Sequence, residues 1–189
     1  MTLRSLGHRR RLPLVIAVLA AGSLGLSSCV LSKIHTSSPT YRVITGHCVF
    51  LGTTTSSRFA KCDYSRANFS GDNAPGIDFN QTAWSFALMN DVQMQSSSFV
   101  DSNFSHATIT NANFNAANFN HVNFADANLT GSVFSSATML DDDFAGANLH
   151  LAQSLSAASL AGSLWRDTTC PNGTNSDHDG GTCVHDLHP

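Results

Sequence analysis

A hydrophobic residue recurs at every fifth position from Tyr64 to Leu149, and this period limits the possible folds more than any other feature of the chain. An α-helix repeats at about 3.6 residues and a strand at about two, so neither explains the period. Self-similarity at a short fixed period predicts a repeat architecture. The positions are Tyr64, Phe69, Ala74, Phe79, Trp84, Met89, Met94, Phe99, Phe104, Ile109, Phe114, Phe119, Phe124, Leu129, Phe134, Met139, Phe144 and Leu149.

The other positions of the five-residue unit are also patterned. The residue two before each central position is usually Ala, Ser or Thr, and the residue one before it is often Asn or Asp. Residues 112–116 (ANFNA) and 127–131 (ANLTG) resemble the pentapeptide-repeat family, whose unit is A-(D/N)-(L/F)-x-x. The resemblance covers about residues 57–165.

This resemblance implies an all-β fold, a right-handed quadrilateral β-helix with four units and twenty residues per coil. About five coils spaced like paired strands form a rod of about 25 Å. The central residue and the small residue two before it are expected to point inward, and the other three to face solvent. Residues twenty apart are then expected to stack, which gives an aromatic column of Tyr64, Trp84, Phe104, Phe124 and Phe144.

The period slips by one residue near the end of the repeats. The central position after Leu149 would be Ser154, but the pattern resumes at Leu155, Leu160 and Trp165. We interpret this slip as a one-residue insertion in the last coil, comparable to a β-bulge.

Residues 1–28 have the features of a bacterial export signal. A basic segment (residues 4–11) precedes a short apolar core, which is too short to span a membrane. Residues 26–29 (LSSC) resemble the lipobox of bacterial lipoproteins, which implies a diacylglycerol on Cys29 and cleavage before it. An ordinary signal peptide that contains a Cys is the alternative, and Sec and twin-arginine export both stay open. Lipidation would anchor the mature chain to the extracytoplasmic face of the cell membrane, with residues 29–45 as a tether.

Four further cysteines, Cys48, Cys62, Cys170 and Cys183, permit three pairings. A bond across the rod would have to bridge about 25 Å, which disulfide geometry forbids. We therefore expect Cys48–Cys62 and Cys170–Cys183, one at each end of the rod and formed in an oxidising compartment. Zinc is the competing interpretation, but no C-x-x-C spacing is present.

Both ends of a solenoid need caps, because they expose unpaired strand edges. The expected organisation is an N-terminal cap at 46–61, the β-helix at 62–165 and a C-terminal disulfide loop at 166–189. The Cys-Pro-Asn-Gly-Thr and Gly-Gly-Thr-Cys sequences of the last segment resemble the tail of other secreted pentapeptide-repeat proteins.

Two inward positions carry an acid where a small residue is expected, namely Asp72 and Asp142. A buried carboxylate requires hydrogen bonds or a charged partner. We expect each of them to accept backbone N–H groups and to have a structural role.

Metal binding is a minor alternative. Stacking places Asp101, His121 and Asp141 in one outward column, and His106 beside Asp126 in another. An imidazole between carboxylates is a pH-sensitive pair or a weak metal site, although a solvated surface is the favoured interpretation. In the tail, Asp177 and Asp179 belong to a spacing that is similar to a calcium loop, but flanking helices and the final Glu are absent. No cofactor is expected.

From Cys29 onward, six Lys or Arg oppose thirteen Asp, which gives 6 − 13 = −7. Some members of the family use an acidic rod to imitate DNA and bind type II topoisomerases. Export argues against that role here, and no nucleic-acid partner is expected. No catalytic motif is present in the mature region. We therefore expect a non-enzymatic, lipid-anchored interaction module whose partner is an envelope protein, a polysaccharide or a second copy of the chain.

Overall fold

The structure is a computed structural model that describes residues 30–32, 42–44 and 59–188. Strands β1 (Val30–Ser32) and β2 (Arg42–Ile44) form an antiparallel pair in which Val30 lies opposite Ile44. The segment predicted to be a tether therefore contains two paired strands. The predicted signal peptide, Cys29, Cys48 and residues 46–58 of the predicted cap lie outside the described residues. Within the described part of the chain, no helix has the length and apolar character needed to cross a membrane.

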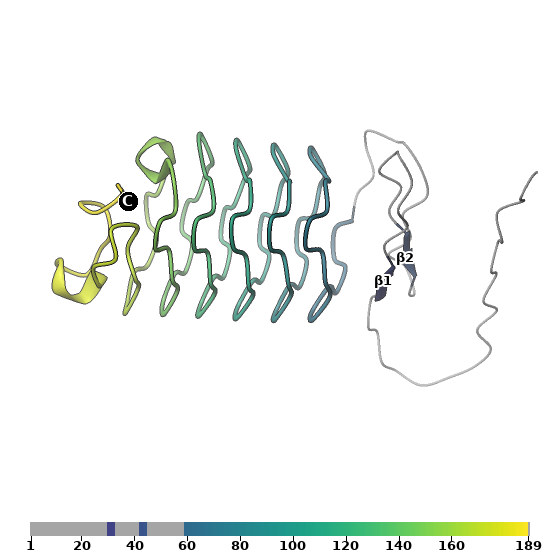
Figure 1. Cartoon of the computed structure of the whole chain (residues 1–189), viewed down its shortest axis with the longest axis horizontal. Coiled ribbons are helices and arrows are strands. Elements are labelled where there is room, and N and C mark those ends of the chain that lie inside the picture. The colour runs from purple at the N-terminus through teal and green to yellow at the C-terminus, as the bar shows by residue number, and fades with distance from the viewer. Residues whose placement is uncertain (1–29, 33–41, 45–58, 189) are drawn as a thin grey trace, which may run out of the picture.

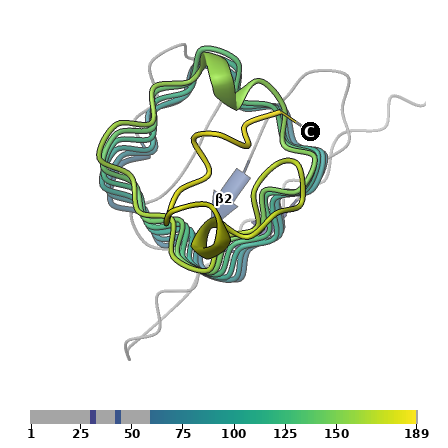
Figure 2. The ribbon, with the colours of Figure 1, turned by 90° about the vertical axis from the view of Figure 1, so that its left-hand side faces the viewer.

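From residue 59 the chain winds into coils that stack along one axis and have a square outline when viewed down that axis (Figures 1 and 2). Isolated parallel bridges join residues twenty apart, from Asp63–Ala83 to Val133–Gln153. The Tyr64 N–H donates to the Ala83 carbonyl at 2.7 Å, and the Ala83 N–H donates to the Cys62 carbonyl at 3.0 Å. The spacing confirms four five-residue units per coil.

Each corner of the square is a tight turn that has a residue in the left-handed region two positions after the central residue. Arg66 has φ of 63° and His121 has φ of 58°. This conformation is that of the third residue of a type II turn. It costs a non-glycine residue about 1–2 kcal/mol. Hydrogen bonds between coils offset this cost, such as the bond from the Arg66 N–H to the Ser85 carbonyl at 2.9 Å.

The central residues fill the interior of the prism, as the sequence predicts. The predicted aromatic column is present, with ring centroids 5.5 Å apart for Trp84–Phe104, 5.3 Å for Phe104–Phe124 and 5.2 Å for Phe124–Phe144. Burying each large side chain contributes about 1.5–3 kcal/mol. Ala74 differs from the other central residues, because it is only half-buried.

The predicted insertion is also present. The 3₁₀ helix η1 (Leu155–Ala157) interrupts the last coil and follows Ser154, whose φ is 61°. Beyond it, bridged residues are 21 apart instead of twenty, as in Thr138–Ser159. Leu155 and Trp165 are buried, so the inward pattern of central residues resumes after the insertion. The extra residue is accommodated in η1, at one corner of the square (Figures 1 and 2).

The C-terminal segment folds back across the end of the prism (Figure 2). An antiparallel bridge joins Thr169 to Asn175, and the 3₁₀ helix η2 (Ser176–His178) follows. Cys170 and Cys183 form a disulfide with their Cα atoms 5.3 Å apart, and both are buried. The C-terminal disulfide is therefore confirmed. Cys62 is also disulfide-bonded, but its predicted partner Cys48 lies outside the described residues.

Candidate functional site: the His–Asp face

One side of the prism carries both histidine–aspartate pairs found in the described coils, and we call it the His–Asp face. Each side of the square spans five residues. Along a coil, a corner residue is followed two positions later by the residue in the middle of the side, and three positions after that by the next corner residue. The middle of this face is the column Asn103, Asn123 and Asp143, and its two corners are the column Asp101, His121 and Asp141 and the column Phe86, His106 and Asp126.

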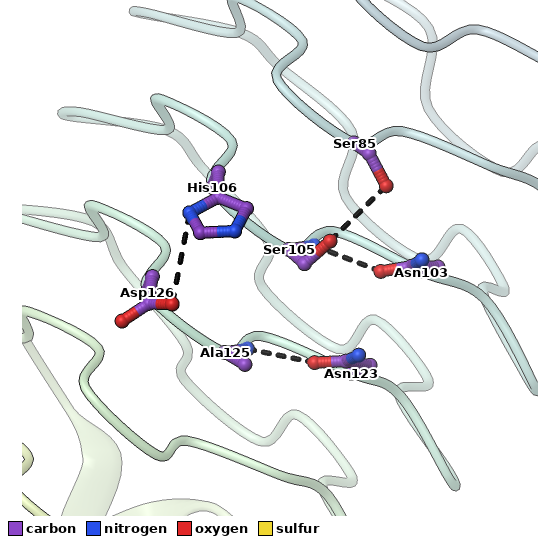
Figure 3. Close-up of polar contacts among 7 residues, drawn as sticks. All are labelled: Ser85, Asn103, Ser105, His106, Asn123, Ala125 and Asp126. Atoms are coloured by element: carbon purple, nitrogen blue, oxygen red, sulfur yellow. Dashed lines mark hydrogen bonds and ion pairs between the residues drawn. The ribbon is translucent and has the colours of Figure 1, made fainter.

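Local hydrogen bonds hold the polar side chains in the middle of the face. Asn103 Oδ1 accepts from the Ser105 N–H at 2.9 Å, and Asn123 Oδ1 accepts from the Ala125 N–H at 2.8 Å (Figure 3). Asp143 makes the same contact with the Ala145 N–H at 3.0 Å. Because Oδ1 of each Asn is occupied, the amide NH₂ groups are left to donate to a ligand. Such donors recur about one coil, or about 4.8 Å, apart.

The two corner pairs are weak ionic contacts. His106 Nδ1 lies 3.6 Å from Asp126 Oδ2, and His121 Nε2 lies 3.8 Å from Asp141 Oδ2. Both distances exceed that of a good hydrogen bond. All four side chains are exposed, so each pair contributes about 0–1 kcal/mol. The pairs therefore lie on the surface and contribute little to stability.

Phe86 is a feature of this face that the repeat pattern did not identify. Phe86 is 52% exposed. Its φ is 61°, which is a strained conformation for a bulky residue. The Arg66 guanidinium lies 5.8 Å from the ring centroid, and the His106 ring stacks on the ring at 4.7 Å. The sequence did contain one indication of this exposed ring, because Phe86 is a large aromatic residue that does not occupy a central position of the five-residue unit. The corner thus presents a cation, an aromatic ring, an imidazole and the carboxylate of Asp126 in succession.

The metal candidates are not brought together. The structure pairs His121 with Asp141, but Asp101 takes part in no ion pair among the described residues. In the same part of the chain, no group of three or more His, Cys, Asp or Glu side chains is arranged to hold a metal ion.

The calcium-like spacing in the tail is a set of turn contacts. Asn175 Oδ1 accepts from the Asp177 N–H at 2.9 Å, and Asp177 Oδ1 accepts from the Asp167 N–H at 3.0 Å. Asp186 Oδ1 accepts from Asn172 Nδ2 at 2.6 Å. One buried oxygen of Asp179 has no hydrogen-bond partner. The oxygens of Asn175, Asp177 and Asp186 therefore bond to groups of the tail and do not converge on one point.

Asp142 lies inside the prism, behind the His–Asp face, and is fully buried. Its Oδ1 accepts from the Val122 N–H at 2.7 Å, which confirms the expected backbone contact. Burial raises the pKa of this carboxyl group to about 8, the Val122 hydrogen bond opposes the rise, and the Asp141 charge adds to it. Asp142 Oδ2 has no hydrogen-bond partner. Asp72, the other inward acid, is also buried.

Comparison with known proteins gives a family. Residues 97–135 and 117–153 match the family model of pentapeptide repeats, with eight copies. Among solved structures, a trypsin-treated form of QnrB1, a plasmid-mediated fluoroquinolone resistance protein, is 17% identical with a TM-score of 0.44, over 58% of this chain and 60% of QnrB1. HetL of Nostoc sp. PCC 7120, a pentapeptide repeat protein involved in heterocyst differentiation regulation, is 20% identical with a TM-score of 0.31, over 64% of this chain and 55% of HetL.

The chain thus aligns with less than two thirds of the length of either protein. A search of curated proteins finds no match. The match to the family model and the square, twenty-residue coils agree with each other. The repeat region of the chain belongs to the pentapeptide-repeat family, whose members fold as right-handed quadrilateral β-helices.

Proposed function

We propose that the protein is a non-enzymatic interaction module that presents its His–Asp face to a partner, and that a lipid on Cys29 anchors it at the extracytoplasmic face of the cell membrane. One observation carries the first part. The large central side chains are used to fill the core, whereas the ionisable and amide groups of the His–Asp face stand on the outside at fixed spacing.

The face is suited to binding because its backbone is hydrogen-bonded to the adjacent coils on both sides. In the middle coils, each turn is hydrogen-bonded to the coil before it and the coil after it, as at His106, whose N–H donates to the Ala125 carbonyl at 2.9 Å. The side chains therefore lose little backbone freedom when a partner binds, which favours affinity. A broad polar face fits an extended partner, such as an envelope protein or a polysaccharide, better than a small molecule, which binds in a concave pocket.

The anchor is supported by the sequence alone. Cys29 follows a basic segment and a short apolar core, and the LSSC sequence resembles a lipobox. Mass spectrometry of the mature N-terminus tests this part. We expect a diacylglycerol-modified Cys29 at the new N-terminus, and release of the protein from membranes in a Cys29→Ser variant. An unmodified N-terminus at another residue would contradict the anchor and leave the interaction module untouched.

Site-specific photocrosslinking in intact cells tests the binding face. Asn103 and Asn113 form a matched pair, because both lie in the same coil and both accept a backbone N–H two residues later, at 2.9 Å and 3.1 Å. Asn113 lies two units away, on the opposite side of the square. A crosslinker at position 103 is expected to capture a partner that a crosslinker at 113 does not. Equal capture at both positions, or none at either, would refute a binding face at this place.

An acidic rod that imitates DNA and binds a type II topoisomerase is the second candidate. Residues 59–188 contain three Lys or Arg and thirteen Asp, so their net charge is 3 − 13 = −10 with His neutral. A field of that sign attracts cationic partners. A supercoiling assay with purified gyrase discriminates between the two candidates. Inhibition by the mature protein, together with a cytoplasmic location in cell fractions, would favour the second one.

A further inference from the structure

Inward serines make a recurring bridge between adjacent coils. Ser102 Oγ accepts from the Thr82 N–H at 3.1 Å and donates to the Phe79 carbonyl at 3.0 Å. A side chain of one coil thus enters the turn of the preceding coil and satisfies both its N–H and its carbonyl group. Ser97, Ser132 and Ser163 make the same bridge. The bridge needs one acceptor and one donor, and a hydroxyl group supplies both.

Asp142 occupies this position, in the same inward column as Ser102 and Ser163. Its Oδ1 makes the accepting half of the bridge, from the Val122 N–H at 2.7 Å. Ser102 donates to the carbonyl group 23 residues earlier, that of Phe79. The equivalent acceptor for Asp142 is the carbonyl group of Phe119. No group of the described residues donates a hydrogen bond to this carbonyl, and Asp142 Oδ2 has no partner either.

An ionised carboxylate cannot complete the bridge, because it has no proton to donate. It would leave two acceptors unsatisfied inside the core, which is costly. We propose that Asp142 is the neutral carboxylic acid in the folded protein, that its Oδ2–H donates to the Phe119 carbonyl, and that this proton makes the solenoid more stable in acid than at neutral pH.

The charges around Asp142 are consistent with this proton. Burial is the main cause of the raised pKa, and the carboxylate of Asp141 adds to it. His121, on the preceding coil, lies 3.8 Å from Asp141 and is directed at that exposed carboxylate. Asp143, the other neighbour in the chain, bonds to the Ala145 N–H on the outside. The following coil contributes residues 162–164, none of which titrates. No cation among these groups would hold Asp142 ionised.

The sign of the pH dependence follows from the two pKa values. An unfolded Asp has a pKa of 3.8, and Asp142 in the fold has a pKa of about 8. The stabilisation due to the proton is therefore complete below about pH 4 and is lost as the pH rises to about 8. Within that window the unfolding equilibrium constant rises up to about tenfold per pH unit through this group. Ordinary paired carboxylates have the opposite effect.

The other Asp residues of the described coils also contribute to the pH dependence of stability. Acid unfolds proteins mainly by protonating carboxylates that are paired in the native state. The His106–Asp126 and His121–Asp141 pairs are both exposed, and carboxylates such as those of Asp63 and Asp143 accept backbone N–H groups. Protonation would also relieve repulsion among the thirteen Asp residues, which only three Lys or Arg oppose between residues 59 and 188.

Denaturation of the full chain between about pH 4 and pH 8 tests the proposal. Asp142→Asn retains the shape of the neutral acid, because its carbonyl oxygen accepts from Val122 and its NH₂ donates to Phe119. We expect this variant to match the wild-type protein below about pH 4 and to exceed its stability at higher pH, with a gap that grows up to about tenfold per pH unit as the pH rises to about 8. Asp141→Asn is the exposed control, and the large gap is not expected there.

A second variant and a direct measurement complete the test. Asp142→Ser restores the bridge that Ser102 makes and should show the same loss of pH dependence if the Asn variant folds poorly. Carbon-13 NMR of the Asp142 carboxyl group reports its protonation without reference to stability, and a protonated group is expected at pH 6. An ionised Asp142 at pH 6, or an Asn variant that is less stable than the wild-type protein at pH 8, would overturn the proposal.

Discussion

Replacement of Phe104 by Leu tests whether the stacked aromatic column holds the coils together. Phe104 is fully buried, and its ring lies 5.5 Å from Trp84 at an interplanar angle of 3° and 5.3 Å from Phe124 at 22°. Each aromatic pair contributes about 0.5–1.5 kcal/mol beyond the area it buries. Leu occupies the central position elsewhere in the repeat, so Phe104→Leu keeps the fold but breaks both stacks. We expect a loss of about 1–3 kcal/mol, and about 3–5 kcal/mol for Phe104→Ala.

Ile109→Leu is the control for this substitution. Ile109 is also fully buried and belongs to the next column of the prism, in which its neighbours Met89 and Leu129 are aliphatic. A volume-conserving change of this kind usually costs less than about 1.5 kcal/mol. Urea denaturation followed by circular dichroism and by the fluorescence of Trp84, which stacks on Phe104, and of Trp165 measures both variants. Coils contact only their neighbours, so the Phe104 variants should also broaden the transition. The stacking argument fails if Phe104→Leu costs no more than Ile109→Leu.

Two further predictions concern the corners and the C-terminal cap. Gly131 and Gly76 both have positive φ, but a Cβ at Gly131 would lie 2.5 Å from Asn111 Oδ1, whereas one at Gly76 meets nothing within 4 Å. Gly76→Ala should therefore cost about 1–2 kcal/mol and Gly131→Ala more in the same denaturation assay, and equal losses would contradict the role of the contact. Removal of the Cys170–Cys183 disulfide by two Ser substitutions should cost about 3 kcal/mol and increase hydrogen exchange in residues 166–188 first. An unchanged exchange pattern would show that the cap holds without the bond.

Much of the structure of the repeat region could be predicted from the sequence. The inward central residues and the insertion before Leu155 follow from spacing, because the pattern within each five-residue unit indicates which positions point inward. The twenty-residue coil was implied by the resemblance to the pentapeptide-repeat family. A solenoid needs no pairing between distant segments, since each coil contacts only the next one. The His106–Asp126 and His121–Asp141 neighbours were predictable from that coil length, as residues twenty apart on an outward corner.

The structure alone decided the features that depend on where a particular atom lies. Spacing placed Asp142 inside the prism but did not show that the Phe119 carbonyl lacks a donor, because that depends on which turn each side chain enters. The contacts of the exposed Phe86 ring with Arg66 and His106 could not be predicted from the repeat pattern, since Phe86 does not occupy a central position of the unit. The sequence determines the register of the coils because burial acts on every unit alike. Hydrogen bonds and ring contacts between coils are short-ranged and directional, so only the three-dimensional arrangement determines them.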